Sequence, residues 1–149
     1  MFSEESKVSM GNGSFKNISE LRQGDYILNK FNDPVKVYSI QKINQQQVLR
    51  IELNNGTEPF YTTPDTLFLC SFNNENQFVS KYLNIREIKN LNAKLKISLK
   101  IFSNETNVNC NGNDNDNNDI LIKNVYKLTT LDQDNTESYF INGVITKYQ

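Results

Sequence analysis

The sequence predicts an all-β fold built from antiparallel hairpins. Short segments rich in Val, Ile, Tyr, Phe and Thr are separated throughout by Gly, Asn, Asp and Pro, which is typical of strands joined by tight turns. Only two segments show helical spacing of apolar residues, and both are too short to be stable without tertiary packing. Five dipeptides favour the positive φ angles of hairpin turns, namely Asn12-Gly13, Gly24-Asp25, Asn55-Gly56, Asn73-Asn74 and Asn142-Gly143.

The expected strands follow one another along the whole chain, each bounded by turn residues and enriched in β-branched or aromatic side chains. They are Lys7–Met10, Tyr26–Lys30, Val35–Ile43, Val48–Leu53, Phe60–Thr63, Leu67–Phe72, Gln77–Tyr82, Leu95–Phe102, Ile120–Leu131 and Tyr139–Lys147. The two helical segments are Ile18–Leu21 and Ile85–Leu91, which we expect to form single turns.

One Asn/Asp-rich segment, Ser103–Asp119, offers almost no apolar side chain to bury. Because ordering such a segment costs conformational entropy that nothing offsets, we expect it to be a mobile loop. With 149 residues, the chain has the length of one domain with a single core. We therefore expect one domain, 1–149, that carries a mobile loop at 103–119.

Composition excludes several classes of function. Sixteen Lys and Arg residues against 17 Asp and Glu leave a net charge of -1, which disfavours nucleic-acid binding by bulk electrostatics. The start of the chain, MFSEESK, has no basic flank followed by an apolar core, and no run of about 18 apolar residues occurs, so we expect a soluble, cytoplasmic, monomeric protein without a membrane segment. The chain has no histidine, so the usual acid, base and metal ligand of neutral pH is missing.

Three blocks of sequence form a pattern that spans the chain. The first lies within MFSEESKVSMGNGSFKNISELRQGDYILN and consists of Lys7-Val8, Asn12-Gly13, Ile18, Leu21, Gly24-Asp25 and Ile27-Leu28. The second is FYTTPDTLF, from Phe60 to Phe68, and the third is VYKLTTLDQDNTESYFINGVITKYQ, from Val125 to Gln149. In this order and spacing the blocks resemble those of the Hint domain, the fold shared by inteins and the hedgehog autoprocessing domain. The resemblance implies a horseshoe of antiparallel strands with pseudo-twofold symmetry, in which the first and last strands meet at the centre.

The resemblance also implies where self-splicing chemistry would take place. In the family, the first residue is a cysteine or serine that attacks the preceding carbonyl group, whereas Met1 stands there in this chain and its thioether has no proton to lose. A histidine that protonates the departing amide nitrogen is replaced by Thr66, whose hydroxyl is too weak an acid for this role. Two other residues of that block, Thr63 and Asp65, match the family's pattern.

The third block departs from the family in the same way. Lys127 stands where the family has an acidic residue or a cysteine, and Glu137 stands where it has a histidine. The histidine and asparagine that normally finish the domain correspond to Lys147 and Tyr148, and tyrosine has no amide group to cyclise. On this alignment every step of splicing lacks its reacting group, so we expect only vestigial catalytic positions.

Other residues that might carry chemistry are better explained as structural. We expect Cys70, among apolar neighbours, to be a buried core residue, and Cys110 to be a loop residue without a functional role. Asp114, Asp116 and Asp119 resemble a calcium loop only faintly, since the required Gly and Glu are missing. Nothing in the sequence brings Asp25 and Glu52 together as an acid/base pair. We expect five tyrosines to be core or half-buried residues rather than a surface that stacks on bases, namely Tyr26, Tyr38, Tyr61, Tyr126 and Tyr139. We therefore expect neither a cofactor nor a metal.

Three functional interpretations remain open. The leading one is a catalytically inactive Hint-like domain, a pseudoenzyme that is either a binding module for a protein or peptide at the central cleft or a decayed splicing element. The second is an active autoprocessing enzyme that was inactivated by substitution or uses unusual residues. The third is an unrelated small β protein, which is distinguished by whether the two chain ends meet at a central cleft.

Overall fold

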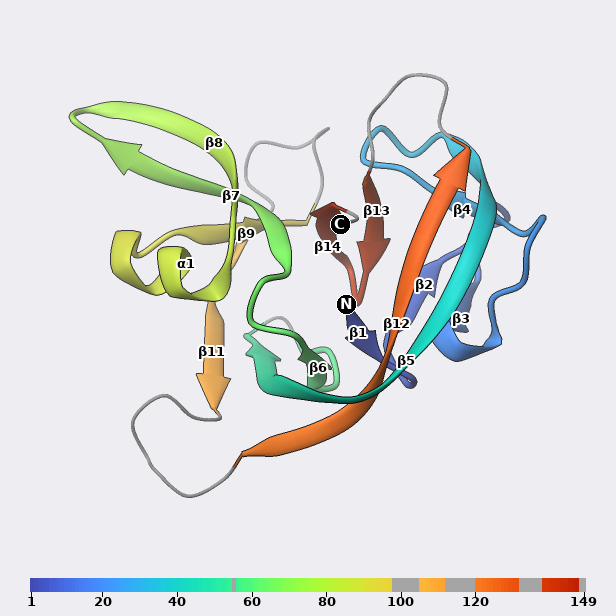
Figure 1. Cartoon of the computed structure of the whole chain (residues 1–149). Helices are drawn as coiled ribbons and strands as arrows, with labels where there is room; N and C mark the ends of the chain where they lie inside the picture. Colours follow the sequence, from blue (N-terminus) through green and yellow to red (C-terminus); the bar gives the residue numbers. More distant parts are fainter. Residues whose placement is uncertain (55, 98–104, 112–119, 132–137, 148–149) are drawn as a thin grey trace.

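A computed structural model describes all residues except 55, 98–104, 112–119, 132–137 and 148–149. The described part is almost entirely β, as the sequence predicts, and its strands form two curled antiparallel sheets arranged as a horseshoe (Figure 1). One sheet has the order β11-β5-β12-β1-β6, with β4 also paired to β5, and the other has the order β10-β9-β7-β14-β13-β2-β3, with β8 paired to β7.

The strands of the first part of the chain are short, apart from β5. They are β1 (Phe2–Ser3), β2 (Lys7–Ser9), β3 (Phe15–Asn17), β4 (Tyr26–Leu28), β5 (Pro34–Leu53), β6 (Phe60–Thr62), β7 (Leu67–Asn74) and β8 (Gln77–Leu83). The remaining strands are β9 (Lys94–Lys96), β10 (Glu105–Thr106), β11 (Val108–Asn111), β12 (Leu121–Leu131), β13 (Ser138–Ile141) and β14 (Val144–Lys147). A 3-10 turn, η1 (Ile18–Glu20), and one helix, α1 (Ile85–Leu91), complete the described elements.

Helix α1 begins with a capping box, in which the Asn84 side chain accepts a hydrogen bond from the Glu87 N–H and the Glu87 carboxylate accepts one from the Asn84 N–H. Its apolar residues Ile85 and Ile88 are buried. The helix ends at Asn92, whose φ of 51° is left-handed. The helix has seven residues, which make about two turns, so the prediction of a single turn underestimates its length.

Two expected strands, Val35–Ile43 and Val48–Leu53, are one continuous strand in the structure. The intervening polar residues remain extended because β12 pairs with them, with Leu121 opposite Val48 and Lys123 opposite Gln46. A left-handed Gln45 (φ 54°) and a register shift between Lys123 and Val125 bend the ribbon at this point. In Figure 1 the long β5–β12 ribbon forms one arm of the horseshoe.

The expected loop 103–119 contains two strands, which is a correction to the prediction of a segment without regular structure. Glu105 and Thr106 pair with β9, and residues 108–111 pair with β5 from Leu53 to Arg50. Backbone pairing with neighbouring strands stabilises this segment, and side chains add to it, since Thr106 is buried and donates to Asn54 Oδ1 at 2.6 Å and Val108 packs against the core. The rest of it lies outside the described residues, and its mobility stays a prediction.

Four of the five predicted turns contain a residue with positive φ, including Gly13 (87°) and Gly143 (82°). The exception is Asn73-Asn74, because β7 continues through both residues and the turn lies at Glu75 (49°) and Asn76 (69°). Both central residues of that turn are left-handed, as a type I′ hairpin requires.

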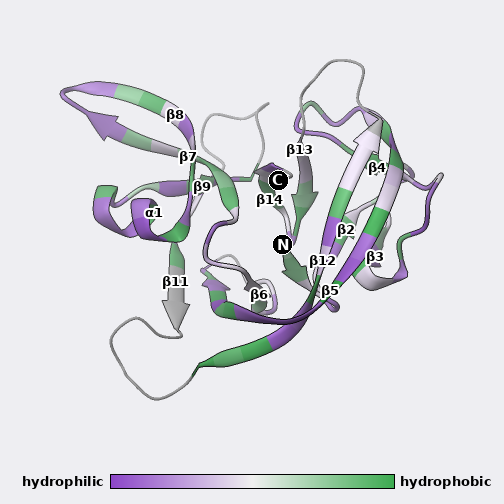
Figure 2. Ribbon diagram, in the orientation of Figure 1, coloured by the Kyte–Doolittle hydropathy of each residue, from purple (hydrophilic) through white to green (hydrophobic). Residues whose placement is uncertain are grey.

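The core lies between the sheets and includes the centre of the horseshoe. Phe2, Phe68 and Ile141 are each at most 1% exposed. Figure 2 shows that β1, at this centre, is hydrophobic, whereas the tip of the β7–β8 hairpin is hydrophilic. Strand β2 pairs with β13 through Val8 and Ile141, so the first and last parts of the chain meet at the centre as predicted.

Candidate functional site

The first strand holds residue 1 at the centre of the molecule. Phe2 lies opposite Thr62 of β6 on one side and opposite Tyr126 of β12 on the other. Its ring packs against the rings of Phe60, Phe68 and Tyr139, with centroids 6.0 to 6.3 Å apart. This buried aromatic cluster fixes β1, and therefore fixes the position of Met1.

Both polar backbone groups of Met1 are hydrogen-bonded to the threonine block. The Met1 nitrogen donates to Thr63 Oγ1 at 3.0 Å and to Thr66 Oγ1 at 2.7 Å. The Met1 carbonyl oxygen accepts from the Thr63 N–H at 3.0 Å and from the Thr62 hydroxyl at 2.9 Å. All three threonines are buried. Residue 1 is therefore held at both ends of its backbone by one short segment of chain.

A turn brings the two hydroxyls to the same nitrogen. The Thr66 N–H donates to the Thr63 carbonyl at 3.2 Å, while Pro64 and Asp65 between them are exposed. The hydroxyls also contact each other, with Oγ1 atoms 3.0 Å apart for Thr63 and Thr66, and the Thr62 Oγ1 lies 2.7 Å from that of Thr66. The block thus forms a connected group of hydroxyls beneath Met1.

What the hydroxyls can do follows from their acidity. A general acid for an amide at this position has to deliver a proton to the departing nitrogen near neutral pH. Thr63 and Thr66 both lie within hydrogen-bond distance of the Met1 nitrogen, but a threonine hydroxyl is far too weak an acid for that step. The two hydroxyls therefore hold the nitrogen in place without serving as general acids.

The electrostatics of the site follow from burial. Desolvation lowers the pKa of the Met1 amine from 8.0 to about 5; the nearby Asp65 carboxylate acts to raise it, and the Lys127 ammonium acts to lower it further. The amine is therefore uncharged at neutral pH. In this way a basic group can remain in an enclosed site without an ion pair.

The structure brings together most of the positions that the sequence singles out. Lys127 and Lys147 lie with Met1, Tyr126 and Tyr139 around a cavity of about 10 Å³, enough for no more than a single water molecule. The Lys147 ammonium also lies 5.7 Å from the centroid of the Tyr82 ring. Glu137 and Tyr148 lie outside the described residues.

Sequence reasoning missed two residues that build the site. Thr62 contributes a hydroxyl to both the Met1 carbonyl and Thr66, and Phe2 anchors β1. The sequence offered a clue to Thr62, because two threonines precede Pro64 and only the second, Thr63, was assigned to the site. A two-residue strand such as β1 is too short to show any periodicity.

The other candidates occupy separate places. Cys70 is fully buried, and burial raises the pKa of its thiol to about 12, so it is a core residue as predicted. Asp25 accepts from the Arg22 N–H and from Lys16, whereas Glu52 pairs with Arg50, so the two carboxylates do not form a pair.

Of the tyrosines, Tyr126 and Tyr139 are buried, but the expectation that all five are core or half-buried is wrong for Tyr26 and Tyr38, which are 53% and 55% exposed. Both lie on outward-facing positions of β4 and β5, beside exposed Lys36. The side chains of Cys110, Asp114, Asp116 and Asp119 are outside the described part. No helix within the described residues is long and apolar enough to cross a membrane.

Comparison with known proteins identifies the fold. No protein-family model and no curated protein matches the sequence. The structure is similar to that of a DnaB intein from Synechocystis sp. PCC 6803, with a TM-score of 0.71 and 14% identity over 99% of this chain and 97% of the intein. It is also similar to the MchDnaB-1 intein (TM-score 0.69, 8% identity, 99% of each chain) and to the gp41-1 intein (TM-score 0.64, 14% identity, 98% of this chain and 96% of that one). The chain therefore has the Hint fold of inteins, and the interpretation as an unrelated small β protein is wrong.

Proposed function

We propose that this Hint-fold protein is catalytically inactive and serves as a non-enzymatic binding module. The observation that carries the proposal is the contact between Met1 and the threonine block. Residue 1 offers a thioether in place of a nucleophile, and the groups at its nitrogen are the hydroxyls of Thr63 and Thr66, which are too weakly acidic to protonate a departing amide nitrogen. Neither the attack on a preceding carbonyl group nor the protonation of a departing nitrogen has a group to perform it.

The surroundings of the site support the same proposal. Lys127 occupies the β12 position at which the family's acid or cysteine would stand, and its ammonium disfavours a second positive charge nearby. A histidine acid or base must carry such a charge when protonated. Restoring a histidine at Thr66 alone would therefore place it in an unfavourable field.

We propose that the inactive domain recognises a protein or peptide partner beside the central site. Lys127 on β12 and Lys147 on β14 are each half-buried there. Extended peptides commonly add to β structures through backbone hydrogen bonds. Such a role needs the scaffold but none of the splicing groups.

The test is a fusion in which the chain lies between two reporter domains. Mass spectrometry after a day at neutral pH, with and without added thiol, is expected to show only the intact fusion. Cleavage at either junction would overturn the proposal and assign the protein to the autoprocessing enzymes.

A further inference from the structure

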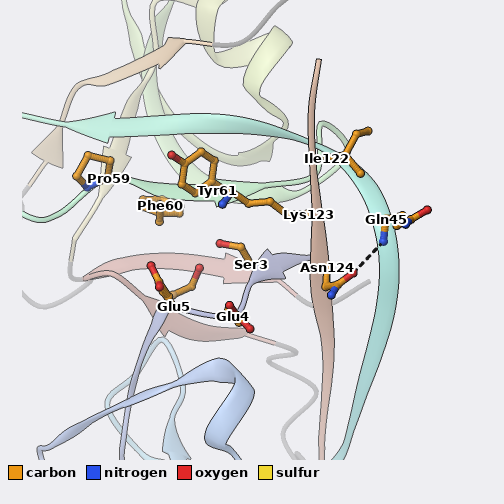
Figure 3. A pocket seen from close by; sticks show the side chains of 11 residues that line it. Ser3, Glu4, Glu5, Gln45, Pro59, Phe60, Tyr61, Ile122, Lys123 and Asn124 are labelled. Atoms are coloured by element: carbon orange, nitrogen blue, oxygen red, sulfur yellow. Dashed lines mark hydrogen bonds between the residues drawn. The ribbon is translucent and has the colours of Figure 1, made fainter. Parts of the chain in front are cut away.

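A second cavity, of about 350 Å³, lies away from the Met1 nitrogen and its threonines, where β1 ends. Its walls come from the turn after β1, from the start of β6 and from β12 near its bend. Figure 3 shows Tyr61 and Lys123 on one side of this cavity and Ser3, Glu4 and Glu5 on the other. Apolar surface is supplied by Pro59, Phe60 and Ile122.

Charges of opposite sign face this cavity without neutralising each other directly. Within the described part of the chain, no ion pair joins Lys123 to Glu4 or Glu5, although all three line the same space. The Lys123 ammonium instead lies 4.3 Å from the centroid of the Tyr61 ring. This contact holds the ammonium on one side of the cavity, apart from the two carboxylates.

Uncommitted hydrogen-bonding groups accompany the charges. Asn124 accepts a hydrogen bond from the Gln45 N–H through Oδ1 at 3.1 Å, which leaves the two N–H donors of its amide without a partner among the described residues. Ser6, which also lines the cavity, is 1% exposed, and its hydroxyl has no hydrogen-bond partner in the described structure.

We propose that this cavity binds a small ligand that carries a carboxylate at one end and an ammonium or guanidinium group at the other. Lys123 and Asn124 donate to the carboxylate, and Glu4 and Glu5 accept from the cationic end. The ligands of this class are arginine and lysine, either free or as the C-terminal residue of a peptide. The two carboxylates outnumber the one ammonium, which favours the free amino acid, since its α-ammonium group adds a second positive charge. The volume suits a ligand of this size, since it lies at the lower end of the range of about 300–1,000 Å³ for ligand pockets.

The site is independent of the proposed loss of splicing chemistry, because it uses none of the residues around Met1. The cavity would be present whether or not the domain could splice, and removing the cavity would not restore splicing. The two proposals therefore fail in different experiments.

Amide chemical shifts from NMR titration test the proposal with a matched set of probes. We expect L-arginine to shift the amides of residues 60, 61 and 122–124, whereas its methyl ester, which lacks the carboxylate, and citrulline, which lacks the side-chain cation, bind about tenfold more weakly or not at all. The tripeptide Ala-Ala-Arg, with a free or an amidated C-terminus, distinguishes a peptide end from the free amino acid as the source of the ligand. Absence of shifts with every probe would overturn the proposal.

Two variants and their controls assign the charges. Lys123→Met is expected to weaken arginine binding about tenfold, and the double variant Glu4→Gln, Glu5→Gln to weaken it by at least as much. Lys42→Met on the same ribbon and Glu75→Gln at the hairpin turn are exposed controls that should leave binding unchanged. All these side chains are exposed, and the amide spectrum of each variant reports whether the fold is kept. Equal binding by the variants and the controls would contradict the assignment.

Discussion

The free energy of unfolding should depend on the protonation of the Met1 amine. In the folded chain, burial lowers the pKa of this amine to about 5, whereas its ordinary value, which applies to the unfolded chain, is 8.0. Between pH 8 and pH 5 the unfolded chain therefore binds a proton that the folded chain does not bind. The folded state consequently loses stability as the pH falls through and beyond this window, by about 4 kcal/mol in all for a difference of about three pKa units.

The assay compares a chain that begins at Met1 with the same chain acetylated at its nitrogen. Urea unfolding of both is measured at pH 8 and at pH 5. The side-chain carboxylates contribute equally to both chains, and any constant effect of the acetyl group cancels when each chain is compared with itself. We expect the free-amine chain to lose about 3 kcal/mol more than the acetylated chain between pH 8 and pH 5, because each titration is only half complete at these two pH values and the full difference is reached only outside them.

An equal loss in the two chains, within about 1 kcal/mol, would refute the reasoning. It would mean that the amine is solvated and is not enclosed between Thr63 and Thr66. A larger loss in the acetylated chain would have the wrong sign for a buried base, and would contradict the account in the same way.

Three further predictions concern particular side chains. Thr66→Val should cost about 1–3 kcal/mol in urea unfolding because it removes the hydroxyl that lies 2.7 Å from the Met1 nitrogen, whereas the exposed control Ser80→Ala should change stability by less than about 0.5 kcal/mol; equal effects would contradict the site geometry. In a Cys110→Ser background, the Cys70 thiol should be alkylated in the folded protein about a thousandfold more slowly than in urea, because it is buried and its pKa is raised to about 12; rapid labelling without unfolding would refute its burial. Asn84→Ala should cost about 1 kcal/mol by removing the side-chain cap of α1, and an unchanged urea midpoint would show that the capping box does not stabilise the helix.

Much of the fold was predictable because local patterns agree with tertiary structure. The segment Ile85–Leu91 is the helix α1 without any shift of its ends, since its buried residues and its Asn84 cap both lie in the local sequence. The positive-φ turn at Asn142-Gly143 was predicted for the same reason, although it divides the single expected strand Tyr139–Lys147 into β13 and β14. Where partners distant in sequence set the structure, prediction failed. The polar stretch around Gln45 is extended because β12 pairs with it, and β11 exists because β5 offers an edge.

The candidate site was predictable in part. Thr63, Thr66 and Lys127 were identified by resemblance, and the structure places all three near Met1. The position of both hydroxyls at the Met1 nitrogen could not be read from the sequence, since it depends on the turn that brings them 3.0 Å apart. The cavity at Lys123 was not predicted at all, because its charges come from the turn after β1 and from β12, which meet only in the folded chain.

The central claim is that the Hint scaffold persists while its reacting groups are absent, and parallel fusions of two chains test it most directly. One fusion carries the chain as it stands; the other carries Met1→Cys, Thr66→His, Lys127→Asp, Lys147→His and Tyr148→Asn together, because groups that act as a unit have strongly non-additive effects and because Lys127 disfavours a protonated histidine at position 66. Mass spectrometry with and without thiol is expected to show no cleavage of the first fusion and measurable cleavage of the second. Cleavage of the unchanged chain at either junction would contradict the account.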